Sequence, residues 1–123
     1  MAVEIRTKIN IVDDRGKPFM GPGVLSVLQG IQEYKSINRA AVQMGLSYVK
    51  ALNLLNRLEA DLGKGILIRK RGGNDRSGSE LTPFGETFIS EYIRLEKRVQ
   101  AHVDKEFRIF QERVAVAERD ASS

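Results

Sequence analysis

The amino-acid sequence predicts a mainly α-helical fold with a small amount of β structure. Apolar residues recur at helical spacing in four successive stretches that cover more than half of the chain. The alternating or β-branched apolar stretches between them are short, as strands of a small sheet are. With 123 residues, 41% hydrophobic and 29% charged, the chain is expected to form one modest core, and no apolar run is long enough to cross a bilayer.

The first segment predicts a β-strand or hairpin. Residues 3–12 alternate apolar and polar side chains, which is typical of a half-buried strand. Asp13, Asp14 and Gly16 favour a turn, and Phe19-Met20 predicts a short returning strand. Two adjacent carboxylates in a turn do not indicate acid-base catalysis, which needs groups positioned in a cleft.

An apolar stripe over residues 24–31 predicts the first helix, with Pro22 near its opening. Gly21 and Gly23 flank this proline, but the segment lacks the Gly-Lys-Ser/Thr ending of a nucleotide loop and the third glycine of a dinucleotide motif. A hinge that leads into the helix is therefore the better interpretation. Gly30 within the helix predicts the close approach of a neighbouring element.

Residues 36–63 predict two helices joined by a tight turn. Gly45 can adopt the left-handed conformation that ends a helix, and Leu46 can then turn into the core. Ser47 has a side-chain oxygen that can cap the next helix. A supporting helix, a turn of about three or four residues and a second helix with a free outer face make a helix-turn-helix.

A basic hairpin is predicted directly after this motif. Residues 65–69 have the apolar, β-branched character of a strand, and residues 79–82 can pair with it. Between them Lys70, Arg71 and Arg76 lie among glycines, in a loop too polar to bury. Such a hairpin is a wing, which we expect to lie along a phosphate backbone or in a minor groove. The alternative is a hairpin that is merely solvated.

The last stretch predicts one long helix. Thr82 can cap it and Pro83 suits its first turn, and apolar residues then step by three or four as far as Ala117. A helix of roughly 50 Å is longer than a small domain can cover, so we expect its far half to pair with the same helix of a second chain. The residues expected to form this dimer contact are Tyr92, Leu95, Val99, Val103, Phe107 and Phe110. His102, the only histidine, lies beside this seam and is expected to face the interface or solvent rather than a metal.

The order of these elements predicts a winged helix-turn-helix domain over residues 1–81 and a dimerisation helix over residues 82–123. The charge distribution agrees with a nucleic-acid partner. Residues 1–81 hold 13 Lys and Arg against 8 Asp and Glu, whereas residues 82–123 hold 7 against 8. The positive excess thus accompanies the two-helix motif and favours attraction to phosphates, although excesses of this size are common on solvated surfaces.

The outer face of the second helix of the pair, residues 47–62, is the predicted reading surface for double-stranded DNA. We expect base contacts from its first turns, at Tyr48, Lys50 and Asn53. Asn53 is chemically suited to adenine and Lys50 to guanine. Backbone contacts are expected from polar and basic residues of both helices and of the wing, namely Ser36, Asn38, Arg39, Ser47, Arg57, Lys70, Arg71 and Arg76.

Three runs, residues 38–63, 66–73 and 81–89, closely resemble the DNA-binding half of the molybdate-responsive ModE-type bacterial repressors. They are similar, more loosely, to the winged helix-turn-helix of LysR-type regulators. The matching features are Ala-Ala at 40–41, Gly-Leu-Ser-Tyr at 45–48, Leu-Glu at 58–59 with Leu-Gly at 62–63, and Leu-Thr-x-x-Gly at 81–85. The resemblance implies a winged-helix dimer that binds a palindromic operator. ModE-type repressors carry oxyanion-binding domains after the long helix, and this sequence ends at Ser123, so we expect a stand-alone form without molybdate sensing.

Three classes of function fit these features to different degrees. The first is a bacterial transcriptional regulator, and the second is a dimeric adaptor that engages another protein through the same fold. An enzyme is the least expected, because the sequence has no cysteine, one histidine and no nucleophile-base spacing. No cofactor, metal or membrane partner is expected. A cytoplasmic location is expected, because the start MAVEIRTK lacks the apolar stretch of a secretory signal. The effector, the operator and any oligomer beyond the dimer are left open.

Overall fold

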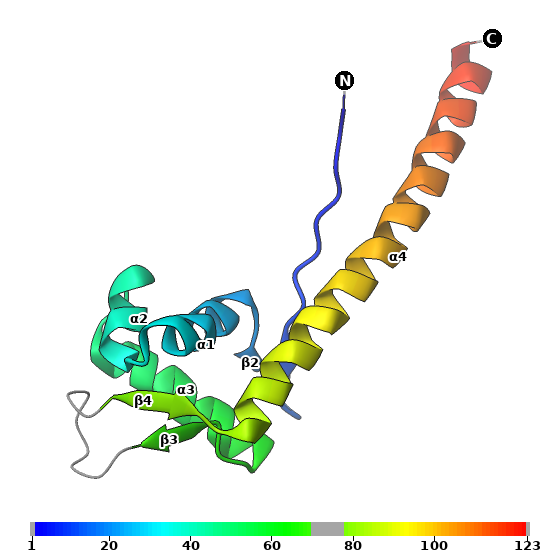
Figure 1. Ribbon diagram of the computed structural model, residues 1–123. Helices are drawn as coiled ribbons and strands as arrows, with labels where there is room; N and C mark the ends of the chain where they lie inside the picture. Colours follow the sequence, from blue (N-terminus) through cyan, green and yellow to red (C-terminus); the bar gives the residue numbers. More distant parts are fainter. Residues whose placement is uncertain (1, 70–77, 123) are drawn as a thin grey trace. The chain divides into compact units, whose positions relative to one another are not determined.

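The computed structural model describes residues 2–69 and 78–122. Its elements follow the chain in the order β1 (Ile11–Val12), β2 (Pro18–Met20), α1 (Pro22–Tyr34), α2 (Ile37–Gln43), α3 (Tyr48–Leu62), β3 (Leu67–Arg69), β4 (Ser79–Leu81) and α4 (Pro83–Ser122) (Figure 1). The mainly α fold with a little β structure is confirmed. The chain divides into two compact units, Ile9–Glu91 on the one hand and Met1–Lys8 with Tyr92–Ser123 on the other.

The core of the Ile9–Glu91 unit lies between α1, α2 and α3. Val27, Leu28 and Ile31 of α1 are fully buried, as are Leu55 and Leu58 of α3. These are positions of the apolar stripes predicted from the sequence, since residues three or four apart share one face of a helix. Packing of one face of each helix leaves the opposite face of α3 in solvent.

Local capping chemistry sets the ends of the helix-turn-helix. Ser36 Oγ accepts the backbone N–H of Arg39 at 3.1 Å at the start of α2. Ser47 Oγ accepts the N–H of Lys50 at 3.1 Å at the start of α3. Gly45 lies between the helices with a φ of +67°, a left-handed conformation in which glycine carries no steric penalty. The turn predicted at Gly45 and Ser47 is therefore confirmed.

The amino-terminal strand predicted over residues 3–12 is wrong for most of its length. Only Ile11 and Val12 pair with β2, and the register shifts between them. Residues 2–8 belong to the other unit, where Gln100 of α4 supplies the hydrogen bonds. Gln100 Oε1 accepts Thr7 N–H at 3.1 Å and Thr7 Oγ1–H at 2.9 Å, and Gln100 Nε2 donates to Ile5 O at 2.8 Å. A side chain on a helix thus takes the place of a partner strand.

The predicted wing is present as the antiparallel pair β3 and β4, with Leu67 opposite Leu81 and Ile68 opposite Glu80. Ile66, the residue before β3, is fully buried and anchors the wing to the core. The basic tip expected to carry Lys70, Arg71 and Arg76 lies outside the described residues.

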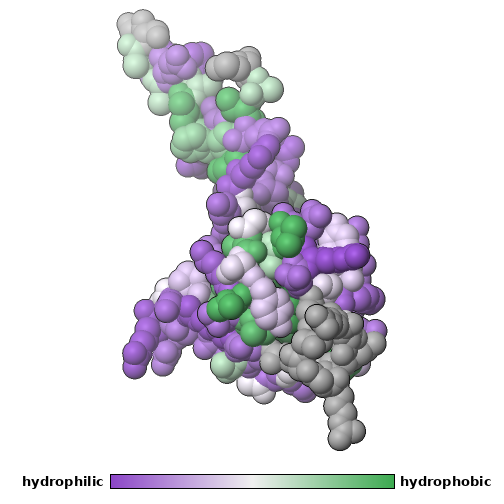
Figure 2. All heavy atoms as spheres, turned by 90° about the vertical axis from the view of Figure 1, so that its left-hand side faces the viewer, coloured by the Kyte–Doolittle hydropathy of each residue, from purple (hydrophilic) through white to green (hydrophobic). Residues whose placement is uncertain are grey.

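The long helix α4 runs over 40 residues, which corresponds to about 60 Å. Within the part of the chain that the structure describes, no helix combines the length and the apolar character that crossing a bilayer demands. The C-terminal part of α4 shows apolar and polar residues side by side on its surface (Figure 2). Its exposed large apolar side chains include Phe110 at 59%, Val114 at 48% and Val116 at 46%.

Candidate nucleic-acid interface

Helix α3 has one buried face and one open face. Ala51, Leu55 and Leu58 are fully buried. The opposite side, about half a helical turn away, presents Val49, Asn53 and Asn56, all exposed. An exposed helix face that follows a tight helix-helix turn is the surface that enters a major groove in helix-turn-helix proteins.

The three residues predicted to contact bases take different positions on α3. Lys50 and Asn53 are exposed on the open side of the helix. Tyr48, the first residue of α3, is half-buried and lies closer to the side that packs inward. All three therefore stay predictions as base contacts, with Lys50 and Asn53 the more accessible.

Sequence reasoning overlooked Val49 and Asn56. Val49 is 63% exposed in the first turn of α3, and an apolar side chain there can contact the methyl group of thymine. The signal was in the sequence, because the positions opposite Ala51, Leu55 and Leu58 on a helical wheel are 49, 53 and 56. The residues predicted to contact bases are selected for their polar side chains, so Val49 is not among them although the helical wheel places it on the open face.

On the supporting helix, Asn38 and Arg39 are exposed in the first turn of α2. Ser36 and Ser47 each use the side-chain oxygen to cap a helix, and both hydroxyl groups lie at helix starts, where backbone N–H groups favour an anion. Val42 is 69% exposed on α2. The polar and basic residues at these helix starts are compatible with the predicted phosphate contacts, which stay predictions for Ser36, Asn38, Arg39 and Ser47.

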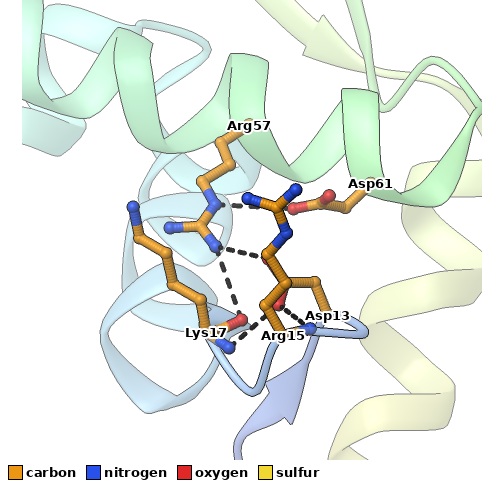
Figure 3. Close-up of polar contacts among 5 residues, drawn as sticks. All are labelled: Asp13, Arg15, Lys17, Arg57 and Asp61. Atoms are coloured by element: carbon orange, nitrogen blue, oxygen red, sulfur yellow. Dashed lines mark hydrogen bonds and ion pairs between the residues drawn. The ribbon is translucent and has the colours of Figure 1, made fainter.

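Two β-hairpins are attached to α3 on different sides. Glu59 Oε2 accepts the backbone N–H groups of Ile66 at 2.8 Å and Leu67 at 3.2 Å, which ties α3 to the wing. Arg57 is tied to the turn between β1 and β2 instead (Figure 3). Residues two apart on a helix point in different directions, so the wing and the β1–β2 hairpin flank α3.

Arg57, predicted as a DNA-backbone contact, is engaged within the molecule. Its Nη2 lies 3.4 Å from Asp13 Oδ2 and donates to Lys17 O at 3.4 Å, and its Nε lies 3.4 Å from Asp61 Oδ2 (Figure 3). Its side chain is 31% exposed. Hydrogen bonds from the N–H groups of Lys17 and Arg15, assisted by the positive charge of Arg57, lower the pKa of Asp13.

The residues predicted to form a dimer contact are spread along α4. Tyr92 is only 3% exposed within a single chain, and burial raises its pKa. Its side chain therefore has little surface left for a partner. Leu95 and Phe110 are 44% and 59% exposed. The remaining three, Val99, Val103 and Phe107, are half-buried. Val103, Phe107 and Phe110 line an apolar hollow together with Ile5 of the amino-terminal segment.

The sequence of this chain is similar to those of known bacterial regulatory proteins. Residues 24–86 match the family model for bacterial regulatory helix-turn-helix proteins of the lysR family. The chain is 30% identical over 81 residues to the molybdenum transport protein ModE of Azotobacter vinelandii, covering 66% of this chain and 30% of that protein. It is 33% identical over 84 residues to the transcriptional regulator ModE of Haemophilus influenzae, covering 68% of this chain and 32% of that protein. The chain thus matches about a third of the length of these relatives.

Solved structures with the same fold include two DNA complexes. The DNA-binding domain of CbnR with DNA superimposes with a TM-score of 0.56 at 24% identity, covering 70% of this chain and 93% of that one. The DNA-binding domain of BenM with benA site 1 DNA gives a TM-score of 0.53 at 24% identity, covering 70% and 91%. The predicted winged helix-turn-helix fold and the resemblance to ModE-type and LysR-type DNA-binding domains are confirmed.

Proposed function

Since the chain belongs to the lysR family of bacterial regulatory helix-turn-helix proteins, we propose that it binds palindromic operator DNA as a homodimer and so regulates transcription. The family match covers the helix-turn-helix, the wing and the start of α4. In this proposal α3 is the recognition helix, and the wing between β3 and β4 lies on the adjacent phosphate backbone.

The open face of α3 is the observation that carries the proposal. Val49, Lys50 and Asn53 are exposed in its first two turns, where a recognition helix contacts base edges. These side chains include a cation suited to guanine, an amide suited to adenine and an apolar group suited to thymine. Each of these three types of side chain can read a base edge in the major groove.

The homodimer is proposed from the C-terminal part of α4. Its exposed apolar side chains include Phe110 and Val114, which are four residues apart and so lie on one side of the helix beside charged residues. Apolar surface on a helix is stabilised when a second helix covers it. A twofold axis at α4 would pair two α3 helices, and such dimers contact half-sites about 34 Å apart, one turn of DNA. A palindromic operator follows from that symmetry.

A dimeric protein adaptor is the second candidate. The apolar side chains of Val42 and Val49 are 69% and 63% exposed, and exposed apolar groups on neighbouring helices also suit a protein partner. In that case the same surface would bind protein, and α3 would have no preference among DNA duplexes.

Selection of duplexes from a random library, followed by titration at several salt concentrations, tests the proposal. We expect an enriched palindrome and an affinity that falls steeply between about 50 and 200 mM salt, because bound phosphates release counterions. Lys50→Ala together with Asn53→Ala should remove the preference for the selected palindrome. Lys105→Ala, an exposed cation on the C-terminal part of α4, is the matched control and should retain it. Absence of any preferred duplex, even at low salt, would favour the adaptor.

A further inference from the structure

In the turn between β1 and β2, one carboxylate is bonded to the backbone of the turn and two basic side chains are exposed to solvent. Asp13 Oδ1 accepts the N–H groups of Arg15 and Lys17, each at 2.9 Å, so this carboxylate closes the turn from inside. Gly16 has a φ of +80° and donates its N–H to Asp13 O at 3.0 Å, which makes the turn compact. The side chains of Arg15 and Lys17 are exposed. The outer side of the turn, with Asp14, therefore carries two cations and one anion.

This turn is held against the recognition helix. Arg57 lies four residues after Asn53 and so on the same side of α3. From there Arg57 contacts both Asp13 and the Lys17 carbonyl, each at 3.4 Å (Figure 3). The turn thus lies beside the helix face that is proposed to enter the groove.

The dimensions of DNA indicate what such an element meets. A major groove is about 12 Å wide, and an α-helix with its side chains is about 10–12 Å across. A helix that enters the groove fills it, so elements attached to the two sides of the helix meet the two phosphate strands. On one side of α3 that element is the wing, tied through Glu59. On the other it is the β1–β2 turn, tied through Arg57.

We propose that the β1–β2 turn is a second DNA-backbone contact, in which Arg15 and Lys17 bind phosphates on the side of α3 opposite the wing. Arg57 is then a positioning residue that holds the turn in place, and not a phosphate contact itself. Its guanidinium faces Asp13 and Asp61, so two carboxylates already balance its charge. The inference rests on the proposed DNA-binding function and adds a contact that the wing cannot supply.

Salt titration of the full chain with its selected operator tests this second backbone contact. Arg15→Gln with Lys17→Gln should make the plot of log Kd against log salt shallower by about 0.9 for each phosphate that the variant no longer neutralises. The control pair Lys105→Gln with Arg113→Gln removes two exposed cations from α4 and should leave the slope unchanged. An unchanged slope in the Arg15 and Lys17 variant, with the wild type still binding, would overturn this inference alone. A wild type that binds no duplex would instead overturn the proposed function.

Asp13→Asn gives a sharper test of the positioning role. Removing a negative charge should strengthen DNA binding if only net charge matters. If Arg57 and Asp13 hold the turn in place, the same variant should weaken binding and speed amide hydrogen exchange at Lys17. Tighter binding with unchanged exchange would contradict the proposal.

A double-mutant cycle separates the two roles of Arg57. Arg57→Met should weaken binding in the wild type but have little further effect in the Arg15→Gln, Lys17→Gln background, because the turn no longer contributes there. An equal decrease of affinity in both backgrounds would mean that Arg57 contacts DNA directly. Thermal unfolding of each variant shows that the comparison is made between folded proteins.

Discussion

Gly85 of α4 lies directly against the backbone of Ile66, at the start of the wing. A Cβ atom at position 85 would stand 2.7 Å from Ile66 O and 3.3 Å from Ile66 Cγ2. The same carbonyl oxygen accepts the N–H of Thr82 at 2.8 Å. Thr82 Oγ1 donates to Gly65 O at 2.8 Å and accepts the N–H of Gly85 at 3.0 Å. The Leu-Thr-x-x-Gly pattern therefore joins the long helix to the wing.

Gly85→Ala should destabilise the protein by roughly 1–3 kcal/mol, the usual cost of overpacking. The backbone of Ile66 cannot yield as a flexible side chain would, and this outweighs the better helix propensity of alanine, about 1 kcal/mol. Chemical denaturation measures the change. Gly23→Ala is the control, since a Cβ there meets nothing within 4 Å, and its stability should stay equal or rise by up to about 1 kcal/mol.

Ser47 variants can separate capping from DNA contact. Ser47→Ala removes the acceptor for the Lys50 N–H and should cost about 1 kcal/mol of stability. Ser47→Asp keeps a cap of similar strength but places a carboxylate where a phosphate is expected. We therefore expect a free energy of unfolding close to that of wild type and weaker DNA binding. Unchanged DNA affinity in Ser47→Asp would remove Ser47 from the predicted backbone contacts.

Val49→Ala should reduce the preference for one base pair within the operator. If the exposed valine contacts a thymine methyl group, its removal lowers discrimination at that position alone, and the free energy of unfolding should change little because the side chain is 63% exposed. Binding to operators with single base-pair substitutions measures the effect. Equal discrimination at every position would exclude Val49 from base reading.

Phe110→Glu should convert the proposed dimer to a monomer. The phenylalanine is 59% exposed within one chain, so a charge there is tolerated in the monomer but not in an apolar interface between helices. Light scattering should give twice the chain mass of 13.8 kDa for wild type and the chain mass for the variant. Lys105→Glu, a charge change at an exposed position on the other side of α4 from Phe110, is a control for nonspecific effects. A wild-type mass of one chain at micromolar concentration would refute the dimer.

The contribution of Asp13 to stability should depend on pH. Its pKa is lower in the folded state than the unfolded value of about 3.9. The folded state therefore favours the carboxylate, and the stabilisation is fully present above about pH 5 and disappears as the pH falls through the folded pKa. The free energies of unfolding of wild type and Asp13→Asn should differ most near neutral pH and converge as the pH falls through the folded pKa of Asp13, which is lower than about 3.9. If the difference in free energy of unfolding between the two proteins does not vary with pH, the substitution acts through altered packing or hydrogen bonding and not through the charge of Asp13.

Much of the fold follows from local chemistry and could be predicted. Capping at Ser36 and Ser47 and the left-handed Gly45 involve residues within a few positions of one another. The buried faces of α1 and α3 follow from helical periodicity, which is also a near-neighbour property. The same periodicity is enough to place Val49 and Asn56 on the open face of α3.

The sequence by itself thus determined the order of the helices, the turn between α2 and α3, and which side of α3 is buried. Only the tertiary structure decided that Arg57 faces Asp13, 44 positions away, and that Gln100 binds Thr7, 93 positions away. It also showed that a Cβ atom at position 85 would stand against the backbone of Ile66. Such pairs depend on the path of the whole chain through space, whereas caps and helical stripes depend only on neighbouring residues.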